Sequence, residues 1–255
     1  MRSFYLLLLA VAGCTAAHAR IGFGPLVGLN ISDYNKEIYK KDIKTQLKLG
    51  GRLGILFDIP FSNHLSLQPG INYVTNGYKA PHYVTTGYNV PLVPAGEIVW
   101  IINTVEVPVN LEYKFGDSCD NHFFVGGGPF VAWNKGGRLH LRGNNIGGSG
   151  GPIDTKRDVY VGTAPSDDIK PWDVGFGVNV GYEFKEGLFA RAHYQMGFLN
   201  LQPTGNDDNA LRNYNFGLSI GYFFHTKAKV KNKAKYKDDD TKVKYKDDKI
   251  KYKDK

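Results

Sequence analysis

Several apolar stretches of this sequence contain charged side chains, and these fall on one of the two sets of alternate positions. Lysine, arginine, histidine and carboxylate groups form ion pairs when apolar surroundings force them to find partners. Nine such side chains share the polar side of the alternation: Lys48, Arg52, Asp58, Glu106, Glu112, Lys114, Glu183, Arg191 and His193. We expect an enclosed ion-pair network, which serves either as a structural plug or as the lining of a gated or selective conduit.

Catalytic alternatives are few. A hydrolase would need a serine with a nearby histidine and an acid. His193 and Ser219 are the one pair worth considering, although their spacing does not place them together. His82 and His140 fall in expected loops, but neither has a second metal ligand at a recognised spacing. The sequence therefore predicts no catalytic site, no metal site and no cofactor.

Glycine and cysteine motifs add no chemistry. The run Gly147–Gly151 lacks the Lys-Ser/Thr pattern and the following helix of a phosphate-binding loop, so we expect a flexible external loop. Only two cysteines occur, which excludes a disulfide scaffold and a Cys-rich zinc module. Cys119, the one cysteine outside the expected leader, is either a free thiol or pairs with another chain.

The elements that position these residues have a period of two, not 3.6. From Asp173 to Phe184, apolar residues alternate with glycine and polar residues, and the stretches 213–224 and 105–115 repeat the pattern. Alternation over such lengths marks strands with one apolar and one polar face. The composition agrees, with 31 glycines, 13% aromatic residues and only 2 methionines.

This reading gives about eight strands. Their expected ranges are 20–31, 45–59, 65–78, 97–115, 122–134, 171–184, 188–202 and 212–225. Short turns alternate with four longer segments, at 32–44, 79–96, 135–170 and 203–211. Short turns at one end and long loops at the other are typical of an antiparallel up-and-down transmembrane β-barrel in an outer membrane. Such a lumen is just wide enough for side chains, so a large open pore is not expected.

The alternation alone does not say which face is buried. A water-soluble barrel with its apolar faces inward is the alternative. Glycines on the polar face, such as Gly177 and Gly217, favour a membrane barrel, because glycine weakens a water-exposed strand but makes room inside a narrow barrel. The strands also reach the 9–11 residues or so that cross hydrocarbon at a tilt.

Aromatic residues gather where the even-numbered predicted strands meet the short turns. We expect them to form a girdle at one membrane–water boundary. Its predicted members are Phe57, Tyr113, Phe115, Tyr182, Phe184, Tyr222 and Phe224. Other tyrosines fall in the expected external segments, where they either contact partners or pack among the loops: Tyr34, Tyr39, Tyr78, Tyr83, Tyr88 and Tyr160.

The first residues have the pattern of a secretory leader. Arg2 precedes a short apolar run, and Ala17-His18-Ala19 forms a cleavage site, so we expect residues 1–19 to be a signal peptide. The alternative is a lipobox at Val11–Cys14, which would leave a lipidated Cys14. No later stretch reaches 18 apolar residues, which predicts no transmembrane helix.

The positive charge lies at the end of the chain. Of the net charge of +8, the 13 Lys and 6 Asp after Thr226 supply +7, so the expected barrel domain, residues 20–225, is near neutral. This excludes a basic nucleic-acid-binding face. The tail, residues 226–255, is too polar to bury a core and is expected to be disordered. It is either a solvated spacer or a contact for peptidoglycan or another anionic periplasmic partner.

Four short motifs point to a family. They are Gly24–Ser32, Leu65–Tyr73, Val105–Leu111 and Gly127–Val131, and in this order they resemble the PorT-like outer-membrane β-barrel family, also labelled porin family. The resemblance covers residues 21–224 and implies an eight-stranded barrel in a Gram-negative outer membrane without catalytic residues. The Lys-rich tail departs from the family's usual ending.

These observations favour a non-enzymatic outer-membrane protein with a structural or interaction role. Its expected partners are outer-membrane lipid, surface proteins at the external loops and an anionic periplasmic polymer at the tail. The alternatives are a narrow transport channel and an accessory component of type IX secretion or gliding machinery, although family-level similarity does not carry that last role.

Overall fold

The computed structural model describes residues 21–38, 41–43, 45–84, 93–116, 120–144, 152–206 and 209–225. All regular elements within these ranges are β-strands. They are β1 (Gly22–Ile38), β2 (Lys41–Ile43), β3 (Gln46–Pro60), β4 (Leu65–Val84), β5 (Val93–Phe115), β6 (His122–Asn144), β7 (Pro152–Asp158), β8 (Trp172–Glu183), β9 (Leu188–Gly197), β10 (Ala210–Tyr222) and β11 (Phe224–His225). No helix in the described ranges is long and apolar enough to span a membrane.

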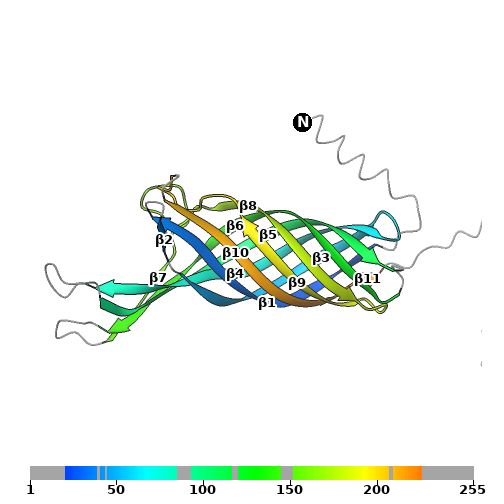
Figure 1. Cartoon of the computed structure of the whole chain (residues 1–255), viewed down its shortest axis with the longest axis horizontal. Coiled ribbons are helices and arrows are strands. Elements are labelled where there is room, and N and C mark those ends of the chain that lie inside the picture. Colours follow the sequence, from blue (N-terminus) through cyan, green and yellow to red (C-terminus); the bar gives the residue numbers. More distant parts are fainter. Residues whose placement is uncertain are drawn as a thin grey trace, which may run out of the picture.

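Eight of the strands close into a ring (Figure 1). The order is β1, β3, β4, β5, β6, β8, β9 and β10, each antiparallel to the next, and β10 returns to β1. Register across this closure runs from Leu26↔Gly221 to Glu37↔Ala210. The short β11 continues β10 beyond Phe223 and pairs with the start of β1. The structure confirms the predicted eight-stranded antiparallel up-and-down barrel.

The apolar side of each strand faces outward. On β8, Val178 is 49% exposed while Asn179 beside it is 6% exposed, and on β10 the values for Leu218 and Ser219 are 59% and 4%. A water-soluble barrel would show the opposite arrangement, because its apolar side chains fill the interior. The exposed apolar surface therefore suits lipid, and the predicted orientation is confirmed.

Glycines on the inner face give space to aromatic rings. A Cβ atom at Gly181 would collide with the Phe124 ring, and one at Gly221 would collide with Phe189. Phe124 and Phe189 form an inner apolar cluster with Leu26, Leu56 and Phe223. A narrow barrel can hold such large side chains only where its neighbouring positions are small.

The segments expected as loops at 32–44, 79–96 and 135–170 are partly strand. β1, β4, β5 and β6 continue into them, and β2 and β7 lie within them. The period-two signal ends there because the outward face no longer meets lipid, while backbone pairing continues without it. In contrast, β9 ends at Gly197 rather than 202, and the residues after it turn over the barrel mouth, where Leu201 is buried.

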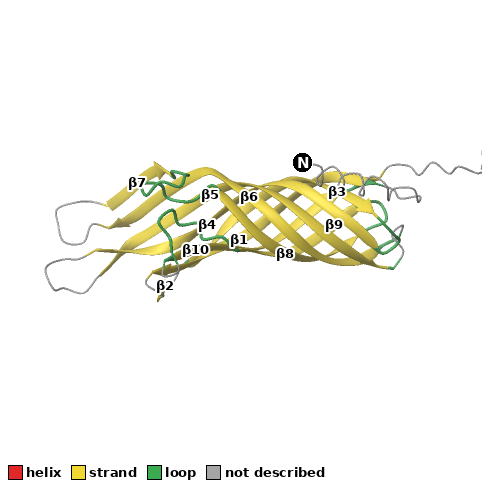
Figure 2. Ribbon diagram, turned by 90° about the horizontal axis from the view of Figure 1, so that it is seen from above, coloured by secondary structure: helices red, strands yellow, loops and turns green. Residues whose placement is uncertain are grey.

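Beyond the ring, the ends of β4, β5 and β6 continue with β7 as an outer part of the same sheet (Figures 1 and 2). The outer parts of β4, β5 and β6 pair with one another, and β7 pairs with β6 from Arg138↔Asp158 to Asn144↔Pro152. One cross-strand row on its inner face contains Tyr78, Trp100, Leu139 and Arg157. Because the short turns are at the opposite end, this sheet lies on the long-loop side of the barrel.

Candidate functional site

The nine predicted charged residues all lie inside the barrel, and none is more than 8% exposed. Alternation along the strands places them there, because every second residue of a barrel strand faces the lumen. Seven of the nine belong to three polar groups, and His193 lines a cavity between two of these groups.

The first group crosses the lumen from β3 to β9. Arg52 Nη1 donates to Glu106 Oε1 at 2.8 Å, and its Nη2 donates to Gln195 Oε1. Gln195 Nε2 and Asn72 Nδ2 donate to the same Glu106 oxygen at 2.9 and 3.2 Å. Three donors therefore converge on one carboxylate oxygen, which offsets the cost of burying its charge.

The second group is centred on Glu112, which is fully buried. Arg191 Nη2 lies 3.5 Å from Glu112 Oε1, and Asn179 Nδ2 donates to this oxygen at 2.9 Å. Arg191 also donates to Gln68 Oε1, and Gln68 Nε2 donates to Asp58 at 2.9 Å. Gln68 thereby joins the second group to the third.

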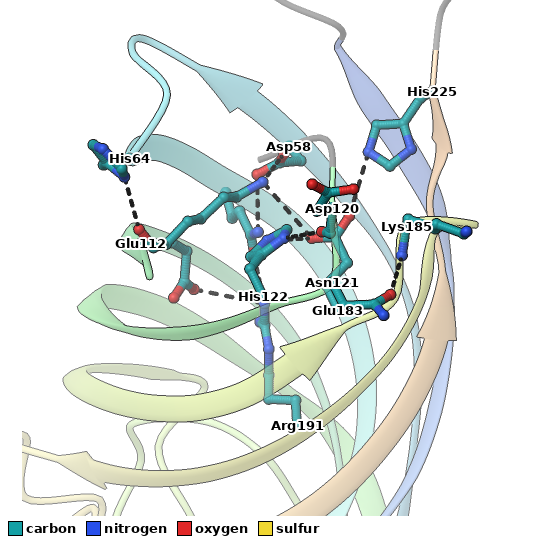
Figure 3. Close-up of polar contacts among 12 residues, drawn as sticks. Asp58, His64, Glu112, Asp120, Asn121, His122, Glu183, Lys185, Arg191 and His225 are labelled. Atoms are coloured by element: carbon teal, nitrogen blue, oxygen red, sulfur yellow. Dashed lines mark hydrogen bonds and ion pairs between the residues drawn. The ribbon is translucent and has the colours of Figure 1, made fainter. Parts of the chain in front are cut away.

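The third group lies at the short-turn end (Figure 3). Lys114 Nζ is 2.7 Å from Asp58 Oδ2 and 3.7 Å from Glu183 Oε2. Glu183 also lies between two imidazoles, with His122 Nε2 at 3.3 Å and His225 Nε2 at 3.4 Å. Residues from β3, β5, β6, β8 and β11 are held together in this way, so the group ties the final short strand to the ring.

A cavity of about 30 Å³ lies between the first two groups, lined in part by Arg52, Arg191, His193 and Ser219. This volume holds about two water molecules. His193 Nε2 and Ser219 Oγ each have no hydrogen-bond partner among the described residues. The two residues that sequence reasoning considered for a hydrolase therefore share a cavity but do not form the Ser–His pair of a catalytic triad.

The other sequence candidates are dispersed. Lys48 donates to the Leu49 carbonyl at 3.2 Å, and no described carboxylate forms an ion pair with it. His140 lies on β6 rather than on a loop, because that strand continues to Asn144, and its ring contacts Asp154 of β7. In the described ranges no three His, Cys, Asp or Glu side chains form a metal-binding group.

Several predictions fall outside the described residues. These are the signal peptide 1–19 with Cys14, Cys119, the run Gly147–Gly151, the tail 226–255, Tyr39, Tyr88 and the side chains of His82 and Tyr83. They remain predictions.

The predicted girdle residues lie on the outer face near the short turns. Phe115 and Phe224 are 54% and 50% exposed, and Tyr182 is half-buried between Phe123 and Phe184, with ring centroids 4.7 and 4.9 Å away. Their contact with a membrane boundary stays a prediction. Sequence reasoning missed two exposed tryptophans farther from the short turns, Trp133 within β6 and Trp172 at the start of β8, whose ring centroids are 6.4 Å apart.

An apolar cap closes the long-loop end of the barrel, and sequence reasoning missed it. Tyr34 and Tyr78 are buried there with Val159, Ile169 and Leu201. These last three lie on the connections between β7 and β8 and between β9 and β10 (Figure 2). Of the two alternatives given for the external tyrosines, Tyr34 and Tyr78 therefore pack among the loops. Tyr160 is 60% exposed.

The amides that complete the lumen groups were also missed. Gln68, Asn72, Asn179 and Gln195 are all buried and share the inward parity of the charged residues. That parity was a usable signal, because each of them alternates with outward apolar neighbours.

Comparison with protein families gives one match. Residues 15–203 match the model of the outer membrane protein beta-barrel domain, which is about three quarters of the chain. No curated protein matches the chain.

Solved structures that resemble the chain are also outer-membrane or surface proteins. Ail of Yersinia pestis, solved with the heparin analogue sucrose octasulfate, is 12% identical, with a TM-score of 0.40 over 80% of this chain and 99% of Ail. Neisserial surface protein A is 12% identical, with a TM-score of 0.41 over 79% and 97%. OprG from Pseudomonas aeruginosa is 11% identical, with a TM-score of 0.37 over 82% and 96%. Similarity at this level does not assign a function.

Proposed function

Because this chain belongs to the outer membrane protein beta-barrel domain family and so resides in the cell outer membrane, we propose that it is a closed, non-enzymatic barrel that binds partners at the cell surface. Within the family, the four motifs noted in the sequence support a PorT-like protein. The proposal has two parts, a filled lumen and an extracellular binding platform.

The filled lumen is the observation that carries the first part. Arg52 and Glu106 join β3 to β5, and Arg191 and Glu112 join β9 to β5, so charged side chains meet across the interior. The apolar cap that contains Tyr34 and Tyr78 covers the outer mouth. An eight-stranded barrel has little interior space beyond its side chains, which supports a plug rather than a conduit.

Electrical recording tests the closed lumen. Purified protein reconstituted in a planar bilayer should give no steady ohmic steps, while its heat-modifiable migration on a gel shows that the barrel is folded. Steady conductance from folded protein would favour the transport alternative and overturn the plug.

The second part rests on the sheet that extends beyond the ring. In the described ranges β7 pairs only with β6, and its residues from Asp154 to Asp158 are exposed. An edge strand with unpaired backbone groups can add a strand from another protein, with side-chain contacts supplying specificity.

Site-specific cross-linking tests this platform. A photo-reactive amino acid in place of Lys156, which is exposed on β7, should give protein adducts in intact cells. The same substitution at Lys185, exposed at the short-turn end, serves as the control that faces the periplasm. Thr155→Pro should disrupt β7 as an edge strand. If the Lys156 adducts form to the same extent with and without this substitution, strand addition is contradicted. Adducts with components of a secretion machinery would instead assign the accessory role.

A further inference from the structure

Two exposed cations lie on β6 just beyond the lipid-facing part of that strand. The strand continues without a break from the ring into the outer part of the sheet (Figure 1). Its exposed residues change from apolar Val131 and Trp133 to charged Lys135 and Arg138. Neither cation forms an ion pair with a described residue. The surface that faces lipid therefore ends in positive charge that the fold itself leaves unpaired.

A bulge in β6 keeps these cations on the outward face. Lys135 is the extra residue of this bulge, at the point where the register between β5 and β6 shifts. Beyond it, Arg138 pairs with Ile101 of β5, whose neighbour Ile102 is fully buried in the interior. Because successive strand residues point to opposite faces, Ile101 and Arg138 point away from the barrel axis.

The height of the two cations places them at the level of lipid headgroups. Trp133 and Trp172 mark the expected outer edge of the apolar band. At about 3.3 Å per residue and a tilt of about 40°, Lys135 lies roughly 5 Å and Arg138 roughly 10 Å beyond Trp133 along the barrel axis. The headgroup layer on each side of a bilayer is about 5–7 Å thick. Long cationic side chains extend toward this layer from either side of it.

Nearby charges leave this part of the surface positive. On the adjoining strands β4 and β5, Lys79 is already partnered, with Nζ 3.8 Å from Glu97. One carboxylate lies beside the cations, because Asp158 of β7 pairs in register with Arg138, but no ion pair joins the two side chains. An anionic group on a ligand would satisfy the cations, and Asp158 would oppose its binding.

We propose that Lys135 and Arg138 bind the phosphate groups of lipid headgroups in the outer leaflet of the outer membrane. The planar guanidinium of Arg138 holds two phosphate oxygens at once, and the ammonium of Lys135 acts as a compact charge. Acyl chains of the same lipid lie against exposed Val131 and Val174 below. The inference rests on residence in the outer membrane, and it is independent of the closed lumen and of protein binding at β7.

Native mass spectrometry of the full chain, released from detergent micelles, tests the proposal. The probes are phosphorylated lipid A, the same lipid A after enzymatic removal of its phosphates, and inorganic phosphate. The phosphorylated form should give a saturable adduct that is about tenfold tighter, because the two lipids share their sugars and acyl chains. Equal affinity for the two lipids would overturn the proposal. Displacement of the lipid by inorganic phosphate, beyond that caused by sodium chloride at equal ionic strength, would also overturn it in favour of a soluble anion.

Variants place the binding on β6. Lys135→Gln and Arg138→Gln should each weaken the phosphorylated adduct by about fivefold and leave the dephosphorylated one unchanged. Asp158→Asn should strengthen the phosphorylated adduct, because it removes the opposing carboxylate. Lys185→Gln is the matched control, since it removes the same charge at the short-turn end, where Glu186 lies 3.8 Å away. Unchanged affinity in both β6 variants, each with normal heat-modifiable migration, would contradict the assignment, and so would an equal loss in Lys185→Gln.

Discussion

At the scale of single residues, the lumen depends on side chains that satisfy one another. Glu106 is 2% exposed and accepts from Arg52, Asn72 and Gln195. Removing one member of such a buried group leaves the opposite charge without compensation, which costs more than the pair itself contributes. The same group would matter little at the surface, where water and salt screen it.

Glu106→Gln should therefore destabilise the barrel by about 3–5 kcal/mol, because Arg52 stays buried and charged without its carboxylate. Urea unfolding in lipid vesicles, followed by the gel shift, measures the change. Glu97→Gln is the matched control, because its carboxylate is 40% exposed and lies 3.8 Å from Lys79, and it should cost less than about 1 kcal/mol. Equal losses in the two variants would contradict the role of the lumen group.

Two inward glycines of β8 should respond differently to an added methyl group. A Cβ at Gly181 would meet both the Phe124 ring and the Ala190 carbonyl, whereas at Gly177 the nearest atom is the flexible Gln195 Cγ at 2.9 Å. Gly181→Ala should cost about 1–3 kcal/mol through overpacking, and Gly177→Ala distinctly less. The same urea titration compares them. A larger loss at Gly177 would show that backbone flexibility, not space for Phe124, sets the glycine requirement.

At the scale of elements, the sequence predicts the strands where lipid imposes a pattern and fails where it does not. The stretch 173–184 alternates strictly and matches β8 (Trp172–Glu183) within one residue. The alternation in the outer part of β6 is short, with Leu139 and Leu141 opposite Arg138, His140 and Arg142, and β7 carries polar residues on both faces, so neither was predicted as a strand. The ion pairs inside the barrel were also unpredictable. Alternation along a strand shows that Arg52 and Glu106 face the lumen, but it does not show that they lie at the same height and meet.

The connection between β7 and β8 depends on one ion pair whose strength should change with pH. The hydrogen bond from Arg157 lowers the pKa of Asp168 below its ordinary value of 3.8. A lowered pKa in the folded state means that the carboxylate stabilises this connection above its unfolded pKa, and that this contribution is lost as pH falls through the folded pKa.

The Tyr160 amide reports this titration directly, because it donates to Asp168. Its NMR shift should titrate with a midpoint below 3.8 in the wild type and with a higher midpoint in Arg157→Ala, which lacks the ion pair. Lys156→Ala, a neighbouring exposed cation on β7, should keep the low midpoint. Identical midpoints in the wild type and Arg157→Ala would show that Arg157 does not control this carboxyl.

At the scale of the whole molecule, the two aromatic zones agree with the thickness of an outer membrane. Along β8, Trp172 and Tyr182 are ten residues apart. At about 3.3 Å per residue and a tilt of about 40°, they are separated by roughly 25 Å along the barrel axis, which is the height of the apolar band in such barrels. We therefore expect the cap and β7 to lie outside the hydrocarbon, and the third lumen group to lie near the periplasmic boundary.

The Lys-rich tail should be dispensable for the barrel. Ring closure is complete at β11, where Phe224 and His225 pair with Phe23 and Gly22 and His225 contacts Glu183, so nothing after His225 is needed for the ring. Deleting residues 228–255 should leave the heat-modifiable migration of the barrel unchanged. We expect the full chain to co-sediment with peptidoglycan in a salt-sensitive way, because the net charge of +7 after Thr226 attracts anionic polymers. The truncated chain should lose this co-sedimentation. A second variant with Asp238, Asp239 and Asp240 changed to Asn should bind more tightly, since it raises that charge. Loss of barrel assembly in the truncated chain would contradict the division of the molecule into a self-sufficient barrel and an accessory tail.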